Sequence, residues 1–239
     1  MDNHNIIIRV ATPADVHYAE TITSEMAESA KARGTGIAKR SPEYVAGKME
    51  EGKAVIAVTP RGEWVGFCYI ENWSHGEYVA NSGLIVAPQY RKGGVAKAIK
   101  KKIFALSREK YPEAKIFGLT TGLAVMKINS ELGYEPVTYS ELTQDEDFWA
   151  GCKSCVNYET LMSKERKNCF CTAMLFDPKD HYEPEETKEF FEENKKGFER
   201  LLQFKKWKLL KPFLKKETNG NGGNGGSKPK SFLHFFLNI

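Results

Sequence analysis

The sequence predicts an α/β protein in which helices cover the faces of one mixed sheet. Short apolar segments that suit strands alternate with helical segments, in the order β-α-α-β-β-β-α-β-α-β. Two of the strand segments, 54–58 and 64–70, are joined by the turn Pro60-Arg61-Gly62, which is typical of a hairpin. After residue 94 an apolar stripe recurs at helical spacing on a segment whose other face carries lysines; it is formed by Val95, Ile99, Ile103 and Leu106.

The remaining elements follow from turn and cap residues. A first strand over 6–10 precedes a helix that starts at 12–15, with Pro13 in its first turn, and runs to about Lys31 before Gly34-Thr35-Gly36. A shorter second helix starts in the same way at Ser41-Pro42-Glu43. Further along we expect a strand over 78–86, a strand over 116–119 and a helix over 124–132, which Gly133 ends in a left-handed conformation.

The chain is expected to divide into three parts. Residues 1–177 form the α/β domain, and the composition changes from Pro178. Residues 178–217 are expected to be a helical extension, since 184–210 can form a long helix that is acidic at its start and basic at its end. Residues 218–239 form a glycine- and asparagine-rich linker and an apolar tail, which we expect to be disordered.

Composition excludes several classes of function. Hydrophobic residues make up 41% of the chain and the net charge is +4, which gives no case for a nucleic-acid partner. The start, Met1 to Asn5, lacks the pattern of a secretory signal, and no apolar run reaches the ~18 residues of a membrane span. We therefore expect a cytoplasmic protein without integral membrane association.

One loop carries the features of an anion site. After the strand over 78–86, a basic glycine-bearing segment leads directly into a helix, so successive backbone N–H groups can form a nest that the helix dipole reinforces. Glycine lets the backbone approach a bulky diphosphate, and cationic side chains lie where phosphate oxygens would be. A sharp turn before a solvated basic helix would give the same pattern. The candidate residues are Arg91, Lys92, Gly93, Gly94, Val95, Ala96 and Lys97.

This stretch resembles the acetyl-coenzyme A signature of the GCN5-related N-acetyltransferase (GNAT) family, Arg/Gln-x-x-Gly-x-Gly/Ala. The later Leu132-Gly133-Tyr134 resembles that family's Leu-Gly-Phe/Tyr. The resemblance implies a mostly antiparallel sheet, splayed where acyl-CoA binds, with acetyl-CoA or succinyl-CoA as co-substrate. It also implies that the backbone of Leu84, Ile85 and Val86 binds the pantetheine arm and supplies the oxyanion donor.

The resemblance locates the catalytic residues less well. Many members carry a tyrosine that protonates the leaving thiolate, at the position held here by Asn129, which can hydrogen-bond but is no useful acid. A solvent-facing helix residue is the alternative for Asn129. Glu71 and His75 are the candidate general bases, because they lie where the third strand turns into the fourth. Each could instead be part of a polar surface turn.

Basic residues mark the expected acceptor side. In this family the acceptor enters over the connection between the first two helices, which carries Arg33, Lys39 and Arg40. Arginine pairs bidentately with carboxylates, so a small acidic amino acid fits better than a polyamine. The chain also resembles bacterial members associated with arginine biosynthesis, which makes glutamate the first candidate; a solvated basic loop is the alternative.

Three functions stay open at this point. The first is an N-acyltransferase acting on a small amine, the second a protein or peptide N-acetyltransferase, and the third a non-catalytic coenzyme A-binding regulatory module. A homodimer is possible.

Four of the five cysteines fall in one short stretch. Cys152-x-x-Cys155 and Cys169-x-Cys171 offer four soft ligands, for which a tetrahedral structural zinc is one option. A strand over the second pair would put both thiols on one face. A redox pair and core packing are the alternatives.

Overall fold

A computed structural model describes residues 6–34 and 39–181, except for the side chain of Arg33. These residues belong to one compact unit, Met1–Tyr182. The helical extension expected beyond residue 181 and the linker and tail over 218–239 lie outside the described residues. No helix in the described part has the length and apolar character that crossing a bilayer requires.

The strands of the described part form one seven-stranded sheet in the order β1-β2-β3-β4-β5-β7-β6. All neighbours pair antiparallel except β4 and β5, which are parallel. The mostly antiparallel mixed sheet predicted from the sequence is thereby confirmed. The strands are β1 Ile7–Val10, β2 Ala54–Val58, β3 Trp64–Trp73, β4 Tyr78–Val86, β5 Lys115–Thr120, β6 Glu135–Val137 and β7 Thr172–Phe176.

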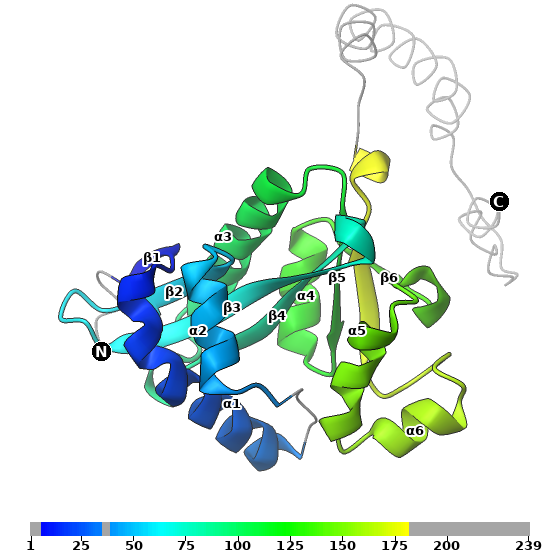
Figure 1. The fold of residues 1–239 in the computed structure, drawn as a ribbon, viewed down its shortest axis with the longest axis horizontal. Coiled ribbons are helices and arrows are strands. Elements are labelled where there is room, and N and C mark those ends of the chain that lie inside the picture. The colour runs from blue at the N-terminus through cyan, green and yellow to red at the C-terminus, as the bar shows by residue number, and fades with distance from the viewer. Residues whose placement is uncertain (1–5, 35–38, 182–239) are drawn as a thin grey trace, which may run out of the picture. The chain divides into compact units, whose positions relative to one another are not determined.

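Helices lie on both faces of this sheet, with α1 and α2 on one face and α3 and α4 on the other (Figure 1). Alternation along β3 explains the division: Phe67 and Tyr69 pack with α1 and α2, whereas Cys68 and Ile70 pack with α3. The helices are α1 Ala19–Arg33, α2 Pro42–Glu50, α3 Val95–Lys110, α4 Leu123–Glu131, α5 Glu146–Ala150 and α6 Tyr158–Ser163.

Two element boundaries differ clearly from the expected ones, whereas others shift by a residue or two. The first helix begins as a 3-10 helix over Pro13–Tyr18, and the α-helix starts only at Ala19. Strand β3 continues past Ile70 to Trp73, because Glu71 and Asn72 still pair with β4. The predicted ends at Gly34 and Gly133 are confirmed, since both glycines are left-handed, with φ of 59° and 87°.

The segment between β6 and β7 was not resolved into elements from the sequence. It contains α5 and α6, which pack with Phe117 and Leu175 on the α1/α2 face of the sheet through Trp149 and Leu161. Cys169 and Cys171 do not lie on a strand, because β7 starts only at Thr172.

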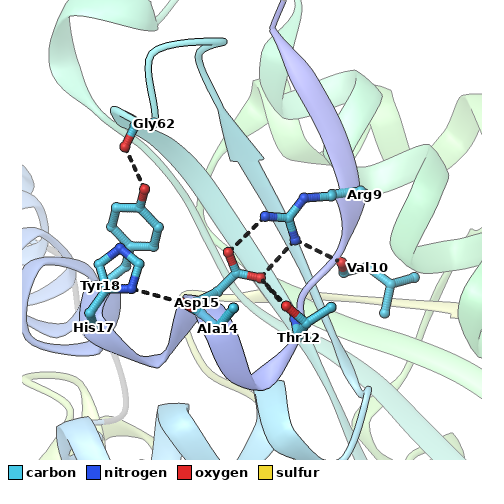
Figure 2. A network of polar contacts seen from close by, with 8 residues as sticks. All are labelled: Arg9, Val10, Thr12, Ala14, Asp15, His17, Tyr18 and Gly62. Atoms are coloured by element: carbon cyan, nitrogen blue, oxygen red, sulfur yellow. Dashed lines mark hydrogen bonds and ion pairs between the residues drawn. The ribbon is translucent and has the colours of Figure 1, made fainter.

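An ion pair ties the end of β1 to the start of the helical layer (Figure 2). The Arg9 guanidinium donates to both carboxylate oxygens of Asp15, at 2.7 Å each, and the backbone N–H of Thr12 donates to the same carboxylate at 2.8 Å. The hydrogen bonds from Arg9 are the main reason that the pKa of Asp15 falls to about 2. On the same helical segment, the Tyr18 hydroxyl donates to the Gly62 carbonyl, which fastens the β2–β3 turn.

Candidate active site

The parallel strands β4 and β5 separate part of the way along their length. They pair from Tyr78 and Lys115 to Ala80 and Phe117, and no further pairing follows, although β4 continues to Val86 and β5 to Thr120. The sheet is therefore open at the carboxyl ends of these two strands, which is where ligands bind in open α/β sheets.

A β-bulge in β4 lies just past this separation. Tyr69 is opposite Ser82 and Phe67 is opposite Ile85, so β4 contains one more residue than β3 between these pairs. Gly83 sits in the bulge with a φ of 64°, and a Cβ there would lie 2.4 Å from the Tyr69 ring. Only glycine fits such a position. The bulge redirects the β4 backbone over 84–86, the residues predicted to hold pantetheine.

The loop after β4 has a backbone conformation that would suit an anion nest. Lys92 and Gly94 are left-handed, with φ of 65° and 80°, and α3 begins directly afterwards. The first α-helical bond runs from Ala98 N–H to Gly94 O at 3.1 Å, so the amides of 95–97 have no acceptor within the helix. No described atom beyond the chain neighbours lies within 4 Å of where a Gly94 Cβ would be. The space beside the Gly94 Cα is therefore open.

The charged side chains of this loop are partly engaged elsewhere. The Arg91 guanidinium donates to Val86 O at 2.9 Å, to Glu25 Oε1 at 2.8 Å and to Ser29 Oγ at 2.7 Å, which ties the loop to α1. Lys97 forms an exposed ion pair with Glu131 at 2.6 Å. Arg91 therefore positions the loop against α1, and the backbone N–H groups of 95–97 remain the candidate groups for an anion.

Asn129 lies beside the opening on the α3/α4 face. It is 1% exposed, so the alternative of a solvent-facing residue is wrong. Its Nδ2 is 3.8 Å from Met174 Sδ and equally far from where a Cβ of Gly118, the first β5 residue past the last β4–β5 pair, would lie. Its Oδ1 is buried and has no hydrogen-bond partner among the described residues. An orphaned acceptor of this kind is costly unless a ligand satisfies it.

A polar network beneath the opening fixes β4 on the same face. Asn81 Nδ2 donates to Ser107 Oγ on α3 at 2.7 Å, and the Tyr134 hydroxyl donates to Asn81 Oδ1 at 3.1 Å. The Lys100 ammonium is buried 5.3 Å from the centre of the Tyr134 ring. Burial lowers the pKa of Lys100 to about 8.

A second polar cluster lies on the opposite face, level with the point of separation. Glu71 is opposite Ala80, the last β4 residue that pairs with β5. The Glu71 carboxylate accepts from Arg40 Nη2 at 2.9 Å and from the Tyr44 hydroxyl at 2.5 Å, while Arg40 Nε lies 3.2 Å from the Tyr69 hydroxyl. Burial, followed by the hydrogen bond to Glu71, raises the pKa of Tyr44 well above its ordinary value.

This cluster brings together two residues that the sequence suggested for different roles, Glu71 as a base and Arg40 as an acceptor anchor. Glu71 is 6% exposed, so the surface-turn alternative is wrong for it. Tyr44 and Tyr69 were missed, because nothing in the sequence distinguishes them from the other tyrosines. An isolated glycine within a strand pattern could have signalled the bulge at Gly83.

The other candidates do not join the cluster. His75 is exposed on the 3-10 turn between β3 and β4, five residues before Ala80 and at the end of β4 remote from the nest. The Lys39 side chain is exposed, and its backbone N–H donates to Ser154 Oγ at 3.1 Å. The side chain of Arg33 lies outside the described residues.

A groove of about 660 Å³ lies on the other side of the nest loop, between α1 and the β2–β3 turn. Its lining includes the carboxylates of Glu20, Glu25, Glu28 and Glu63. These acidic groups disfavour a phosphate ligand, so the separation of β4 and β5 remains the candidate site.

The four clustered cysteines line one small cavity of about 30 Å³, whose wall also includes Leu119 of β5. Burial, and then the charges of neighbouring thiols, raises the pKa of Cys152 to about 11 and that of Cys171 to about 12. In the described part of the chain, no three metal-ligating side chains converge closely enough to coordinate an ion.

No protein-family model matches the sequence, and no curated protein matches it. Solved structures match the fold. The N-acetylglutamate synthase from Neisseria gonorrhoeae, complexed with coenzyme A and N-acetyl-glutamate, is 16% identical with a TM-score of 0.52, over 74% of this chain and 36% of that one. A Mycobacterium tuberculosis protein in complex with CoA is 17% identical with a TM-score of 0.51, over 72% and 98% of the two chains.

A third match is a candidate acetyltransferase from Salmonella typhimurium, solved with its cofactor acetyl-CoA. It is 14% identical with a TM-score of 0.50, over 76% of this chain and 98% of that one. These likenesses show that the described part of the chain has the GNAT acetyltransferase fold. The fold implied by the motifs at Arg91–Ala96 and Leu132–Tyr134 is thereby confirmed.

Proposed function

We propose that this protein is an N-acyltransferase that moves an acetyl or other short acyl group from acyl-CoA to the amine of a small acceptor. The observation that carries the proposal is the separation of β4 and β5 immediately after Ala80 and Phe117. An anion nest lies at the far end of β4, and a buried carboxylate, Glu71, lies level with the separation on the opposite face. The solved structures of this fold named above, each of which contains CoA or acetyl-CoA, support the assignment.

The donor would lie along the opened edge of β4. The amides after Gly94 would hold the diphosphate, and the backbone of 84–86 would hydrogen-bond the pantetheine arm. Asn129 Oδ1, which lacks a partner among the described residues, would accept a hydrogen bond from a pantetheine amide. Acetyl-CoA and succinyl-CoA share these groups, so both are candidate donors.

The chemistry is attack of a neutral amine on the thioester carbonyl. Glu71 would take the proton from the acceptor ammonium, directly or through one water. The amine nitrogen then bonds to the carbonyl carbon, and a backbone N–H near Ile85 or Val86 would stabilise the oxyanion. The nitrogen gives its second proton to solvent as the carbon–sulfur bond breaks, and the thiolate takes a proton from solvent, because Asn129 has none to give at neutral pH.

The ion pair of Arg40 and Glu71 supports one class of acceptor. Glu71 and Arg40 place a carboxylate and a guanidinium 2.9 Å apart, and the Arg40 side chain is 21% exposed. An amino acid carries the complementary pair: its ammonium would meet Glu71, and its carboxylates would meet Arg40 and the exposed Lys39. Glutamate, with a second carboxylate, is the first candidate.

A panel of acceptors tests the proposal. The full-length protein is incubated with acetyl-CoA or succinyl-CoA and with glutamate, glutamine, lysine, spermidine or a lysine-containing peptide, and N-acylated products are identified by mass spectrometry. Mass detection is preferable to thiol reagents because the protein itself carries five free cysteines. Acylated glutamate as the main product is expected. A preference for the peptide would support the protein acetyltransferase, and CoA binding without any product would support the regulatory module.

A further inference from the structure

Four thiols from two short segments, 152–155 and 169–171, gather at one place that the proposed acyl-transfer site does not use. Cys152 belongs to the 3-10 helix Gly151–Ser154 and Cys155 follows it, whereas Cys169 and Cys171 precede β7. All four line the same cavity of about 30 Å³, and the wall is completed by Tyr139, Trp149 and Leu161, among others. A cavity of this size holds about one water molecule or one ion.

Asn157 contacts one cysteine of each pair through its backbone. The backbone N–H of Asn157 donates to Cys155 Sγ at 3.4 Å, and Cys169 Sγ lies 3.9 Å from the carbonyl oxygen of Asn157. The Tyr139 hydroxyl donates to Cys171 O at 2.8 Å. None of the cysteines forms a disulfide. The thiols therefore share one neighbourhood as four separate ligand groups.

The fifth cysteine shows what an ordinary core cysteine looks like in this protein. Cys68 is fully buried in strand β3, and its Sγ–H donates to Ser82 O at 3.3 Å. The clustered four are only half-buried, and Cys152 lies in a 3-10 helix, whereas the other three lie in irregular backbone outside any helix or strand. Core packing explains Cys68, but it does not explain why four thiols surround one cavity.

We propose that Cys152, Cys155, Cys169 and Cys171 bind one zinc ion. Four thiolates favour zinc over magnesium or calcium, and Cys-x-x-Cys is a usual ligand spacing. The thiols now surround the cavity without converging to the 2.3 Å Zn–S distance, so binding draws them inward. The thiols lose their protons as the metal binds.

The position of the cluster gives the metal a role. The backbone N–H of Lys39, in the connection before α2, donates to the Oγ of Ser154, which stands between Cys152 and Cys155 in the sequence. A Cβ on Gly151 would lie 3.7 Å from Arg40 Nη2, so the same segment packs against the polar cluster of Arg40 and Glu71. Zinc therefore braces the wall behind Arg40, on the acceptor side and away from the nest at Gly94.

Metal analysis of the full-length protein, purified without chelators, tests the site. We expect about one zinc per chain in the wild type and in Cys68→Ser, the matched control for a core cysteine. Cys152→Ser and Cys169→Ser are expected to retain less than half of that. Cobalt added to metal-free wild type should give the thiolate-to-metal charge-transfer absorption of a tetrahedral sulfur site, which a purely structural role of the cysteines would not produce.

Several results would overturn the site, and the first three are measured on the wild type alone. The first is wild type that contains no zinc and gives no charge-transfer band with cobalt. The second is a count of fewer than five thiols in denaturant without reductant, which indicates disulfides. The third is iron in place of zinc. Equal zinc in wild type and both serine variants would also do so. Because these readouts do not depend on catalysis, they stand even if the proposed acyl transfer is wrong.

Discussion

Replacing Arg40 with methionine should destabilise the protein by about 2 kcal/mol. Methionine keeps the aliphatic stem but removes the charge, so the carboxylate of Glu71 keeps only the hydroxyl of Tyr44 as its hydrogen-bond partner. Removing one partner of a fully buried ion pair costs about 3–5 kcal/mol. The Arg40 side chain is 21% exposed and that of Glu71 is 8% exposed, so solvent screening reduces the expected cost.

A double-mutant cycle measures the interaction itself. Arg40→Met, Glu71→Gln and the double variant are compared by denaturant unfolding, and we expect a coupling energy of about 1–2 kcal/mol. Lys167→Met is the matched control, because its partner Glu165 is as exposed as Lys167 itself (77% and 76%), and no measurable change is expected. A coupling energy below about 0.5 kcal/mol would refute the reasoning that the pair is a structural unit. Glu71→Gln should in addition lower turnover by about 10²–10⁴-fold without changing CoA affinity, if Glu71 is the base.

Three further predictions concern stability. Arg9 lowers the pKa of Asp15 to about 2. The ionised Asp15 carboxylate therefore contributes stability that is present above its ordinary pKa of 3.8 and is lost as the pH falls through about 2. The difference in unfolding free energy between wild type and Asp15→Asn should shrink over that range. Burial lowers the pKa of Lys100 from 10.5 to about 8, so the unfolded chain binds more protons between these values. Lys100→Met should stabilise the protein by about 1–3 kcal/mol at pH 7, and the gain should shrink as the pH rises from 8 to 10.5; a gain that is constant with pH would contradict this. Gly83→Ala should cost about 2–5 kcal/mol, because a left-handed φ of 64° and a 2.4 Å contact with Tyr69 both oppose a Cβ, whereas equal stability of Gly83→Ala and wild type would contradict the bulge geometry.

The sequence predicted the sheet because the sheet depends on local patterns. Apolar alternation and turn residues define β2, β3 and β4, and the glycines at 93 and 94 indicated the loop before α3. The β6–β7 segment escaped prediction, since its helices span only five and six residues and depend on burial of Trp149 and Leu161 against the sheet.

Side-chain partnerships could not be predicted, because they join residues distant in the sequence. The guanidinium of Arg91 looked available to phosphate, but Glu25 and Ser29, 66 and 62 residues earlier, accept its hydrogen bonds. Glu71 looked like a turn residue because a single polar residue after an apolar run ends a strand pattern. Only the pairing with Ala80 and the approach of Arg40 across 31 residues show that it is buried.

Coenzyme A binding measured by calorimetry tests the central claim most directly, on wild type, Gly94→Ala and Gly47→Ala. Both glycines have open space where a Cβ would lie, but only Gly94 is left-handed, with a φ of 80°. Forcing alanine into that conformation costs about 1–2 kcal/mol, and relaxation of the loop would misdirect the nest amides. We predict that wild type and Gly47→Ala bind CoA with equal affinity and that Gly94→Ala binds about tenfold more weakly. Wild type that fails to bind CoA, or Gly94→Ala that binds as well as wild type, would contradict the account.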